Sequence, residues 1–308
     1  MTAQAIDTIA PRRETTLSAA WRRRMARAAP WLWLAPGIAL FLPFFIIPMA
    51  VVLRNSFNRD DPLALMVSDL TLENYANILT DSYYLTVFSN SILVSLGVTV
   101  GTLLLGYPFA YYLVRHAKAS RGFLLWVVYL PLMVSVIVRA FGWIVITADT
   151  GLINSVLMAT GILKQPLIML FELESMVPAM IHRYLPLMVL PLINAIGKID
   201  DSLYSASANL GASHARTFRK VILPLTAPGI VAGSQLVFAN VLSDFVIPNL
   251  LGSTRFRLLA PVIYEEAAVQ VAWATAAALA MVMLVLVTLM LLLSNWTFRR
   301  LAPWARTL

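Results

Sequence analysis

The sequence contains no cysteine, and only three of its 308 residues are histidines. Without cysteine the chain can form no disulfide, no thiolate metal site and no cysteine nucleophile. The histidines, His116, His182 and His214, are too few and too far apart in the sequence to suggest a zinc cluster. We therefore expect neither a disulfide-stabilised fold nor a resident metal ion.

Charged residues are scarce as well. They make up 12% of the chain, whereas 60% of the residues are hydrophobic and the mean hydropathy is +0.79. So few polar side chains cannot cover the water-exposed surface of a globular protein of this length. The composition excludes an ordinary soluble protein and a disordered chain, and it predicts a protein that crosses a membrane several times.

Six apolar runs are long enough to cross the roughly 30 Å of hydrocarbon in a bilayer. Each must be helical, because an open strand would leave its backbone amides without partners in lipid. The first run follows a cluster of arginines, as in a signal peptide, but it is too long for one and no small-residue cleavage site closes it, so we interpret it as a retained anchor. The predicted spans are 31–53, 86–113, 123–147, 176–196, 226–249 and 274–296.

The distribution of lysine and arginine predicts the orientation of the chain. With a cytoplasmic N-terminus, the cytoplasmic segments hold 16 of the 23 basic residues, and the opposite loops hold five of them together with ten of the 15 acidic residues. This positive-inside bias predicts that both termini are cytoplasmic, and it accounts for the net charge of +8 without a nucleic-acid partner. The cytoplasmic segments are 1–30, 114–122, 197–225 and 297–308.

The same pattern divides the chain into an N-terminal cytoplasmic arm (1–30), a six-span domain (31–297) and a cytoplasmic tail (298–308). The external segments have room for short helices and gates but are too short for an independent domain. They are 54–85, 148–175 and 250–273.

The longest internal cytoplasmic loop, 197–225, predicts two short helices at the membrane surface. Asp200 and the acidic and serine residues after it supply a helix cap, and Gly211 can end the first helix in the left-handed conformation. A second helix, capped by Ser213, would run to Pro224.

The first of these helices is rich in small residues, which would let another protein approach its backbone closely. From composition alone, an amphipathic connector at the membrane surface explains the loop equally well. The small residues are Ser205, Ala206, Ser207 and Ala208.

The spacing in this loop resembles a signature of the permease subunits of ATP-binding-cassette (ABC) importers, which carry the pattern E-A-A-x3-G-x9-I-x-L-P before their penultimate span. Four positions match and Val221 is a conservative replacement. Ser205 replaces the glutamate of the family, which weakens a polar contact to the ATPase that the pattern implies, and Ser207 replaces the second alanine. The aligned positions are Ser205, Ala206, Ser207, Gly211, Val221, Leu223 and Pro224.

Two further stretches, 130–154 and 243–252, resemble the spermidine/putrescine-type permeases. With the six spans, the resemblance covers about residues 30–297. It implies an all-α membrane protein with six transmembrane helices and a cytoplasmic coupling helix, the fold of a type I ABC importer permease in a bacterial inner membrane.

The resemblance also implies partners. Two ATPase subunits would bind ATP and magnesium and contact the first loop helix. A second permease subunit, expected to be a different chain, would complete the pathway. An external solute-binding protein would deliver the solute. This chain has no G-x4-G-K-[ST] phosphate-binding loop, since its Gly197-Lys198 pair is followed by Ile199 and lacks the first glycine. We expect no catalytic residue and no cofactor on the chain itself. The resemblance assigns ATPase coupling to Leu203, Ser205, Ala206, Ser207, Leu210, Gly211, Leu223 and Pro224.

Ionisable residues inside the predicted spans cost roughly 2.5–3.5 kcal/mol each on insertion scales and are functional candidates. Arg139, Arg183 and Asp244 fall at similar depth in the outer half of the membrane. They either line the outer pathway or its gate, or they form a structural ion pair between Asp244 and one of the two arginines. The candidates for the pathway or gate are Arg139, Trp143, Arg183 and Asp244.

The charges leave the solute open. The resemblance suggests a polyamine or a related small polar solute, but two arginines against one aspartate give a net positive lining that would suit a carboxylate or phosphonate anion. A polyamine would need acidic or aromatic residues from the second permease subunit, or ring faces such as that of Trp143.

Two other classes of protein compete with the transporter driven by ATP. An intramembrane protease would need two in-span aspartates or a serine in a Gly-x-Ser-Gly turn, and the spans offer only Asp244 and no such turn. An ion-coupled secondary transporter or channel stays an alternative, against which the pattern in the 197–225 loop argues.

Overall fold

The computed structural model describes residues 16–301 except 62, 64, 118 and 254, with side chains from Trp33 to Arg300. The chain falls into two compact parts, Met1–Arg54 and Asn55–Leu308. Six helical segments of the described residues are long and apolar enough to cross a membrane, as the sequence predicts. The predicted arm and tail lie partly outside the described residues, at 1–15 and 302–308.

The described residues of the first part form one long helix, α1 (Thr16–Asn55), whose last residue already belongs to the second part. Its apolar stretch, Trp33–Asn55, corresponds to the first predicted span. Large side chains such as Trp33 and Phe44 are exposed, as expected for a helix that contacts lipid or another membrane helix.

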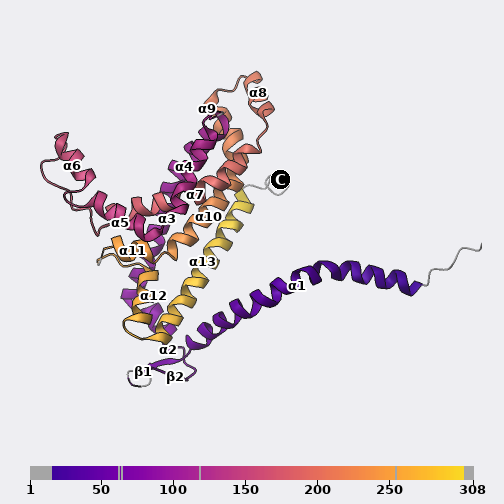
Figure 1. The fold of residues 1–308 in the computed structure, drawn as a ribbon, viewed down its shortest axis with the longest axis vertical. Helices are drawn as coiled ribbons and strands as arrows, with labels where there is room; N and C mark the ends of the chain where they lie inside the picture. The colour runs from indigo at the N-terminus through magenta and orange to yellow at the C-terminus, as the bar shows by residue number, and fades with distance from the viewer. Residues whose placement is uncertain (1–15, 62, 64, 118, 254, 302–308) are drawn as a thin grey trace, which may run out of the picture. The chain divides into compact units, whose positions relative to one another are not determined.

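The second part is built on three packed helices, α3 (Ser82–Arg115), α7 (Leu173–Gly197) and α10 (Leu223–Leu242), with α13 (Trp273–Leu301) beside α10 (Figure 1). Buried side chains at the centre, among them Val98, Met188 and Val237, form a continuous core.

Glycines let α7 approach its two neighbours closely. A Cβ atom added to Gly229 would lie 2.5 Å from the Cβ of Ala195 and 2.8 Å from the carbonyl oxygen of Pro191. A Cβ atom on Gly101 of α3 would lie 2.5 Å from Cδ1 of Ile181. These contacts belong to small-residue packing between membrane helices.

One end of this bundle carries the 197–225 loop, folded into α8 (Asp201–Asn209) and α9 (His214–Thr217) (Figure 1). The other end carries a hairpin of β1 (Arg59–Asp61) and β2 (Leu65–Val67), antiparallel with Asp60 opposite Met66, and the helix α2 (Glu73–Thr80). The Asp60 carboxylate accepts bonds from the backbone N–H groups of Ala274 and Thr275, at 2.8 and 2.9 Å, and so caps α13.

Near this end, α12 (Leu259–Ala268) packs with α2, α3 and α13 around a second, smaller core. The residues that are buried there are Ile78, Val87, Phe88, Leu259, Val262, Ala278 and Leu279.

Two predicted spans differ from the observed helices. The run 123–147 is divided into α4 (Arg121–Met133) and α5 (Val136–Thr147), and α6 (Leu152–Ala159) extends the second piece into a membrane-length segment. Pro131 lies just before the break, and the Arg139 guanidinium donates a 2.8 Å bond to the carbonyl of Val134 inside it. A backbone carbonyl freed by the break is thus satisfied by a side chain.

The fifth predicted span, 226–249, is divided as well. α10 ends at Leu242, and the chain starts a new short helix, α11 (Val246–Leu251). Asp244 lies in the break and accepts a 3.0 Å bond from the N–H of Val246. The apolar residues continue through both breaks, so hydropathy alone does not reveal them.

Candidate functional site

The first candidate surface is α8, and its ends follow the predicted capping. The Asp200 carboxylate accepts a 2.7 Å bond from the N–H of Ser202. The backbone bond from Ser202 holds the pKa of Asp200 below its usual value. At the other end Gly211 has φ +73°, a conformation that L side chains rarely adopt. Both predictions about the ends of this helix are confirmed.

The predicted second loop helix is wrong in its end point. Ser213 caps it, accepting a 3.4 Å bond from the N–H of Arg216, but the helix does not stop at Pro224. α9 continues through a π-helical turn, η1 (Phe218–Ile222), directly into α10. A π turn is wider than an α turn, and Pro224 stands just after it, in the first turn of α10.

The predicted coupling residues fall into three places. Five of them are exposed on α8 or at its end. Ser207 is buried instead, and its hydroxyl lies 2.6 Å from that of Thr217, so it ties α8 to α9. Leu223 and Pro224 begin α10, away from α8. The exposed residues are Leu203, Ser205, Ala206, Leu210 and Gly211.

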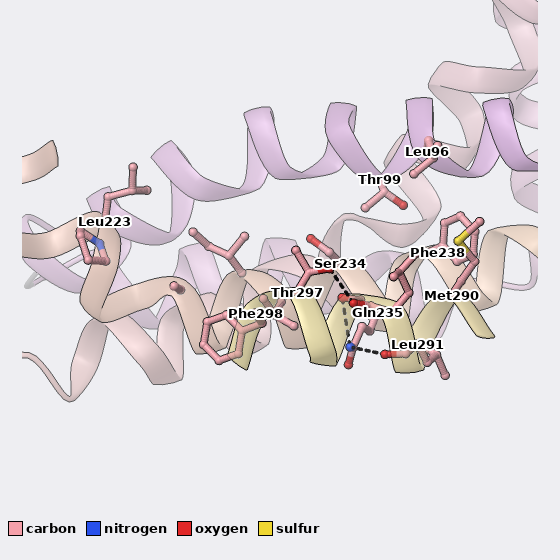
Figure 2. A pocket seen from close by; sticks show the side chains of 16 residues that line it. Leu96, Thr99, Leu223, Ser234, Gln235, Phe238, Met290, Leu291, Thr297 and Phe298 are labelled. Atoms are coloured by element: carbon pink, nitrogen blue, oxygen red, sulfur yellow. Dashed lines mark hydrogen bonds between the residues drawn. The ribbon is translucent and has the colours of Figure 1, made fainter. Parts of the chain in front are cut away.

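Leu223 and Pro224 line a cavity of about 720 Å³ between α3, α10 and α13 (Figure 2). Its walls are mainly apolar, with Phe238 and Phe298 among them. Gln235 is a polar exception, and its amide donates to the carbonyl of Leu291 at 3.4 Å. An apolar cavity of this kind does not offer the polar groups that a hydrophilic solute needs.

Sequence reasoning missed Arg115, the last residue of α3. Its guanidinium forms an ion pair with Asp201, donates a 2.9 Å bond to the carbonyl of Ile199 and lies 4.3 Å from the ring centre of Tyr204. Burial, as the main cause, raises the pKa of Tyr204 to about 12, so its phenol stays neutral beside the cation. A basic residue at the end of one span, opposite acids in a loop predicted to share its side of the membrane, is the signal that could have found this contact.

Aromatic packing joins α3 to the same loop at a second place. The ring of Phe218 lies edge-on to those of Tyr107 and Tyr111, with centroids 5.7 and 6.0 Å apart. The hydroxyl of Tyr107 also lies 2.9 Å from that of Thr226 on α10. The loop is therefore anchored on α3 as well as on α7 and α10.

The second candidate site is the polar cluster inside the membrane, and Asp244 is its centre. Its carboxylate is buried and accepts a 2.9 Å bond from the hydroxyl of Tyr184. The Nε atom of Arg183 lies 3.8 Å from the same carboxylate. Of the two predicted partners of Asp244, the structure places Arg183 beside it, whereas Arg139 bonds to the backbone at the α4–α5 break.

The other candidates of this cluster lie where α5 meets α7. The indole N–H of Trp143 on α5 donates a 3.4 Å bond to Nδ1 of His182 on α7. The Nε atom of Arg139 and the Nη1 atom of Arg183 are buried and have no hydrogen-bond partner among the described residues. Each of these two guanidinium groups therefore keeps one buried donor available to a further acceptor.

The chain is similar to known transport proteins over most of its length. Residues 97–303 match the family described as binding-protein-dependent transport system inner membrane component. The spermidine/putrescine transport system permease protein PotB of Haemophilus influenzae is 35% identical over 230 residues, 75% of this chain and 80% of that protein. The putative 2-aminoethylphosphonate transport system permease protein PhnU of Salmonella choleraesuis is 25% identical over 250 residues, 80% of this chain and 85% of that protein.

A solved structure has the same fold. It is the bacterial alginate ABC transporter in complex with an alginate pentasaccharide-bound periplasmic protein, in which one chain matches with a TM-score of 0.72 and 19% identity, covering 91% of this chain and 97% of that chain. The family match spans more than half of the chain and includes the 197–225 loop. The protein described here thus belongs to the binding-protein-dependent inner-membrane components, the multi-pass permease subunits of ABC importers, and resembles the spermidine/putrescine permeases among them.

Proposed function

We propose that this permease subunit forms half of the pathway of an importer for a polyamine or a closely related small polar solute. The observation that carries this proposal is the 35% identity to a spermidine/putrescine permease over three quarters of the chain. Within the structure, Trp143 is the residue best suited to contact a cationic amine, because the face of an indole ring attracts cations.

The polar cluster shapes this proposal. Asp244 is already bonded to Tyr184, to the N–H of Val246 and to Arg183. A carboxylate that already has these three partners is a poor binding site for a polycation. We therefore assign the acidic contacts for a polyamine to the second permease subunit, and to this chain the aromatic side of the pathway.

An anionic solute is the second candidate, and a separate observation favours it. The buried Nε of Arg139 and Nη1 of Arg183 have unused donors among the described residues, and a carboxylate or phosphonate would satisfy both. The relative PhnU, which is named for 2-aminoethylphosphonate transport, is consistent with this candidate.

Uptake by cells that express the complete transporter and lack other polyamine importers separates the two candidates. We expect uptake of labelled putrescine that excess spermidine inhibits and that 2-aminoethylphosphonate leaves unchanged, with the Trp143→Ala variant weakened. No uptake of putrescine, together with uptake of labelled 2-aminoethylphosphonate that the Arg139→Gln variant loses, would replace the polyamine with the anion.

The mode of energy coupling belongs to the same proposal. Two partner ATPases bind ATP and magnesium, a second and different permease chain completes the pathway, and an external binding protein delivers the solute. Both termini, and the α8 end of the bundle, face the cytoplasm. In proteoliposomes uptake should require ATP and magnesium on the α8 side, and uptake under an ion gradient without ATP would identify an ion-coupled carrier instead.

A further inference from the structure

The contacts of Arg115 show how firmly α8 is held from one side. A single guanidinium reaches three groups of the loop, namely the Asp201 carboxylate, the Ile199 carbonyl and the Tyr204 ring. The side chain of Arg115 is 15% exposed, whereas that of Asp201 is 90% exposed. The arginine is thus fixed in the body of the bundle, and α8 is the exposed element attached to it.

The chemistry at this position suits arginine specifically. A planar guanidinium can donate to a carboxylate and a carbonyl while its face packs on an aromatic ring, and a lysine ammonium cannot make all three contacts at once. The Asp201 carboxylate is open to water, so the ion pair alone contributes little. The bond to the Ile199 carbonyl and the contact with the Tyr204 ring add to it and hold the loop on the buried guanidinium.

The helix behind Arg115 reaches the opposite end of the bundle. α3 has 34 residues, which corresponds to about 50 Å at 1.5 Å per residue. Near its start, the hydroxyl of Ser91 accepts a 2.8 Å bond from the N–H of Leu259, and Tyr84 donates a 3.1 Å bond to Glu266. Both partners belong to α12. One helix therefore bonds to α8 at one end and to α12 at the other.

We propose that Arg115 is a positioning residue that passes the movement of α8 to α3, and through α3 to α12 at the outer end. This inference rests on the proposed function, in which ATPase subunits bind α8. Movement of α8 pulls on the guanidinium, and α3 follows because the arginine stem is packed within the bundle. α3 is thus a second route of coupling, beside the direct continuation of α9 into α10.

The test measures the number of solute molecules imported per ATP hydrolysed by the complete transporter in proteoliposomes. We expect Arg115→Ala to lower this ratio at least tenfold while ATP hydrolysis stays within twofold of the wild type. Arg115→Lys should recover part of the ratio. Arg121→Ala is the matched control, because Arg121 is an exposed cation at the start of α4, close to Arg115 in sequence, and it should leave the ratio unchanged.

The absence of cysteine from the chain permits a direct test of the link. In the double variant Arg115→Cys/Asp201→Cys, a cleavable bifunctional thiol reagent of about the length of the lost ion pair should restore the ratio, and reduction should abolish it again. A restored ratio supports a mechanical link. A ratio that stays low after verified cross-linking overturns it.

The outcomes separate this inference from the proposed function. Uptake by the wild type without ATP hydrolysis would refute the proposed function itself. A coupled wild type with an unchanged ratio in Arg115→Ala would refute the inference alone. The Arg115→Ala variant could also fail to assemble into the complex while Arg115→Lys and the reduced double-cysteine variant keep a normal ratio. Arg115 would then be an assembly contact only, and the inference would be refuted.

Discussion

At the scale of single residues, the membrane-embedded polar cluster illustrates how a costly charge is accommodated. Asp244 sits in the break between α10 and α11, where a free N–H, a phenol and a guanidinium surround its carboxylate. Each contact offsets part of the desolvation of the carboxylate. The sequence leaves open whether Asp244 lines the pathway or forms an ion pair, and both arginines lie at a suitable depth; the structure places Arg183 beside it.

Replacing this carboxylate tests the arrangement. Asp244→Asn keeps an acceptor for Tyr184 but removes the charge opposite Arg183, so we expect a loss of about 1–3 kcal/mol in the free energy of unfolding and impaired uptake. Thermal unfolding in detergent and labelled-solute uptake measure the two effects. The double variant Asp244→Asn/Arg183→Gln should be more stable than the sum of the single changes predicts, and strict additivity would contradict the pairing.

At the scale of elements, the glycines of the spans differ in what surrounds them. Gly229 on α10 faces the backbone of α7, whereas a Cβ atom on Gly97 of α3 would meet nothing within 4 Å. Gly229→Ala should therefore destabilise the bundle by about 1–3 kcal/mol through overpacking. Gly97→Ala is the matched control and should be neutral or slightly stabilising, because alanine favours a helix by about 1 kcal/mol over glycine. Equal melting temperatures in detergent would contradict the close approach of α7 and α10.

The helix α8, the proposed contact for the ATPase subunits, allows a second comparison of matched variants. Gly211 requires a positive φ, which asparagine tolerates and valine does not. We expect Gly211→Val to reduce ATP-driven uptake strongly, Gly211→Asn to retain most of it, and both to insert normally in the membrane. Ala206→Arg keeps the backbone but places a bulky cation on the exposed face, so it should lose binding of the ATPase subunits. Normal ATPase binding by this variant would remove the exposed face of α8 from the contact.

At the scale of the whole second part of the chain, contacts between distant segments join α12 to the start of α3. Tyr84 of α3 donates to Glu266 of α12, 182 residues later. Burial, and then the nearby charges of Glu265 and Asp60, raise the pKa of Glu266 above its usual 4.5. The folded state therefore holds this proton more tightly than the unfolded state, so its contribution to stability grows as the pH falls through the raised pKa toward 4.5.

This shift predicts a pH dependence. In the wild type the melting temperature should decline less between pH 7 and pH 5 than in Glu266→Gln, because the neutral amide cannot take up the stabilising proton. Parallel melting curves for the two proteins would contradict the raised pKa. Glu73→Gln is a suitable control, since Glu73 pairs with Arg59 at an exposed site.

Much of this architecture could be predicted from the sequence, for a physical reason. Spans are recognisable because a helix that crosses the bilayer needs a long run of apolar residues. Helix ends such as those at Asp200 and Gly211 are recognisable because capping depends on neighbouring residues in the sequence. Hydropathy alone does not locate the breaks at Val134 and Asp244, because apolar residues continue on both sides of each break and the few polar residues there, such as Asp244, do not by themselves end a helix. The contact of Arg115 with the 197–225 loop was not predicted for another reason: it depends on which loop the fold brings to the end of α3.

The uninterrupted passage from α9 through η1 into α10 has a geometric consequence. His214–Leu242 is a rod of 29 residues, about 44 Å long at 1.5 Å per residue. If it pivots about its base beside α8, each degree of tilt displaces the far tip by about 0.8 Å, given that length. That tip adjoins the Ser243–Phe245 corner, so a tilt of about 3° at the α8 end would displace this corner by roughly 2 Å, given the same length.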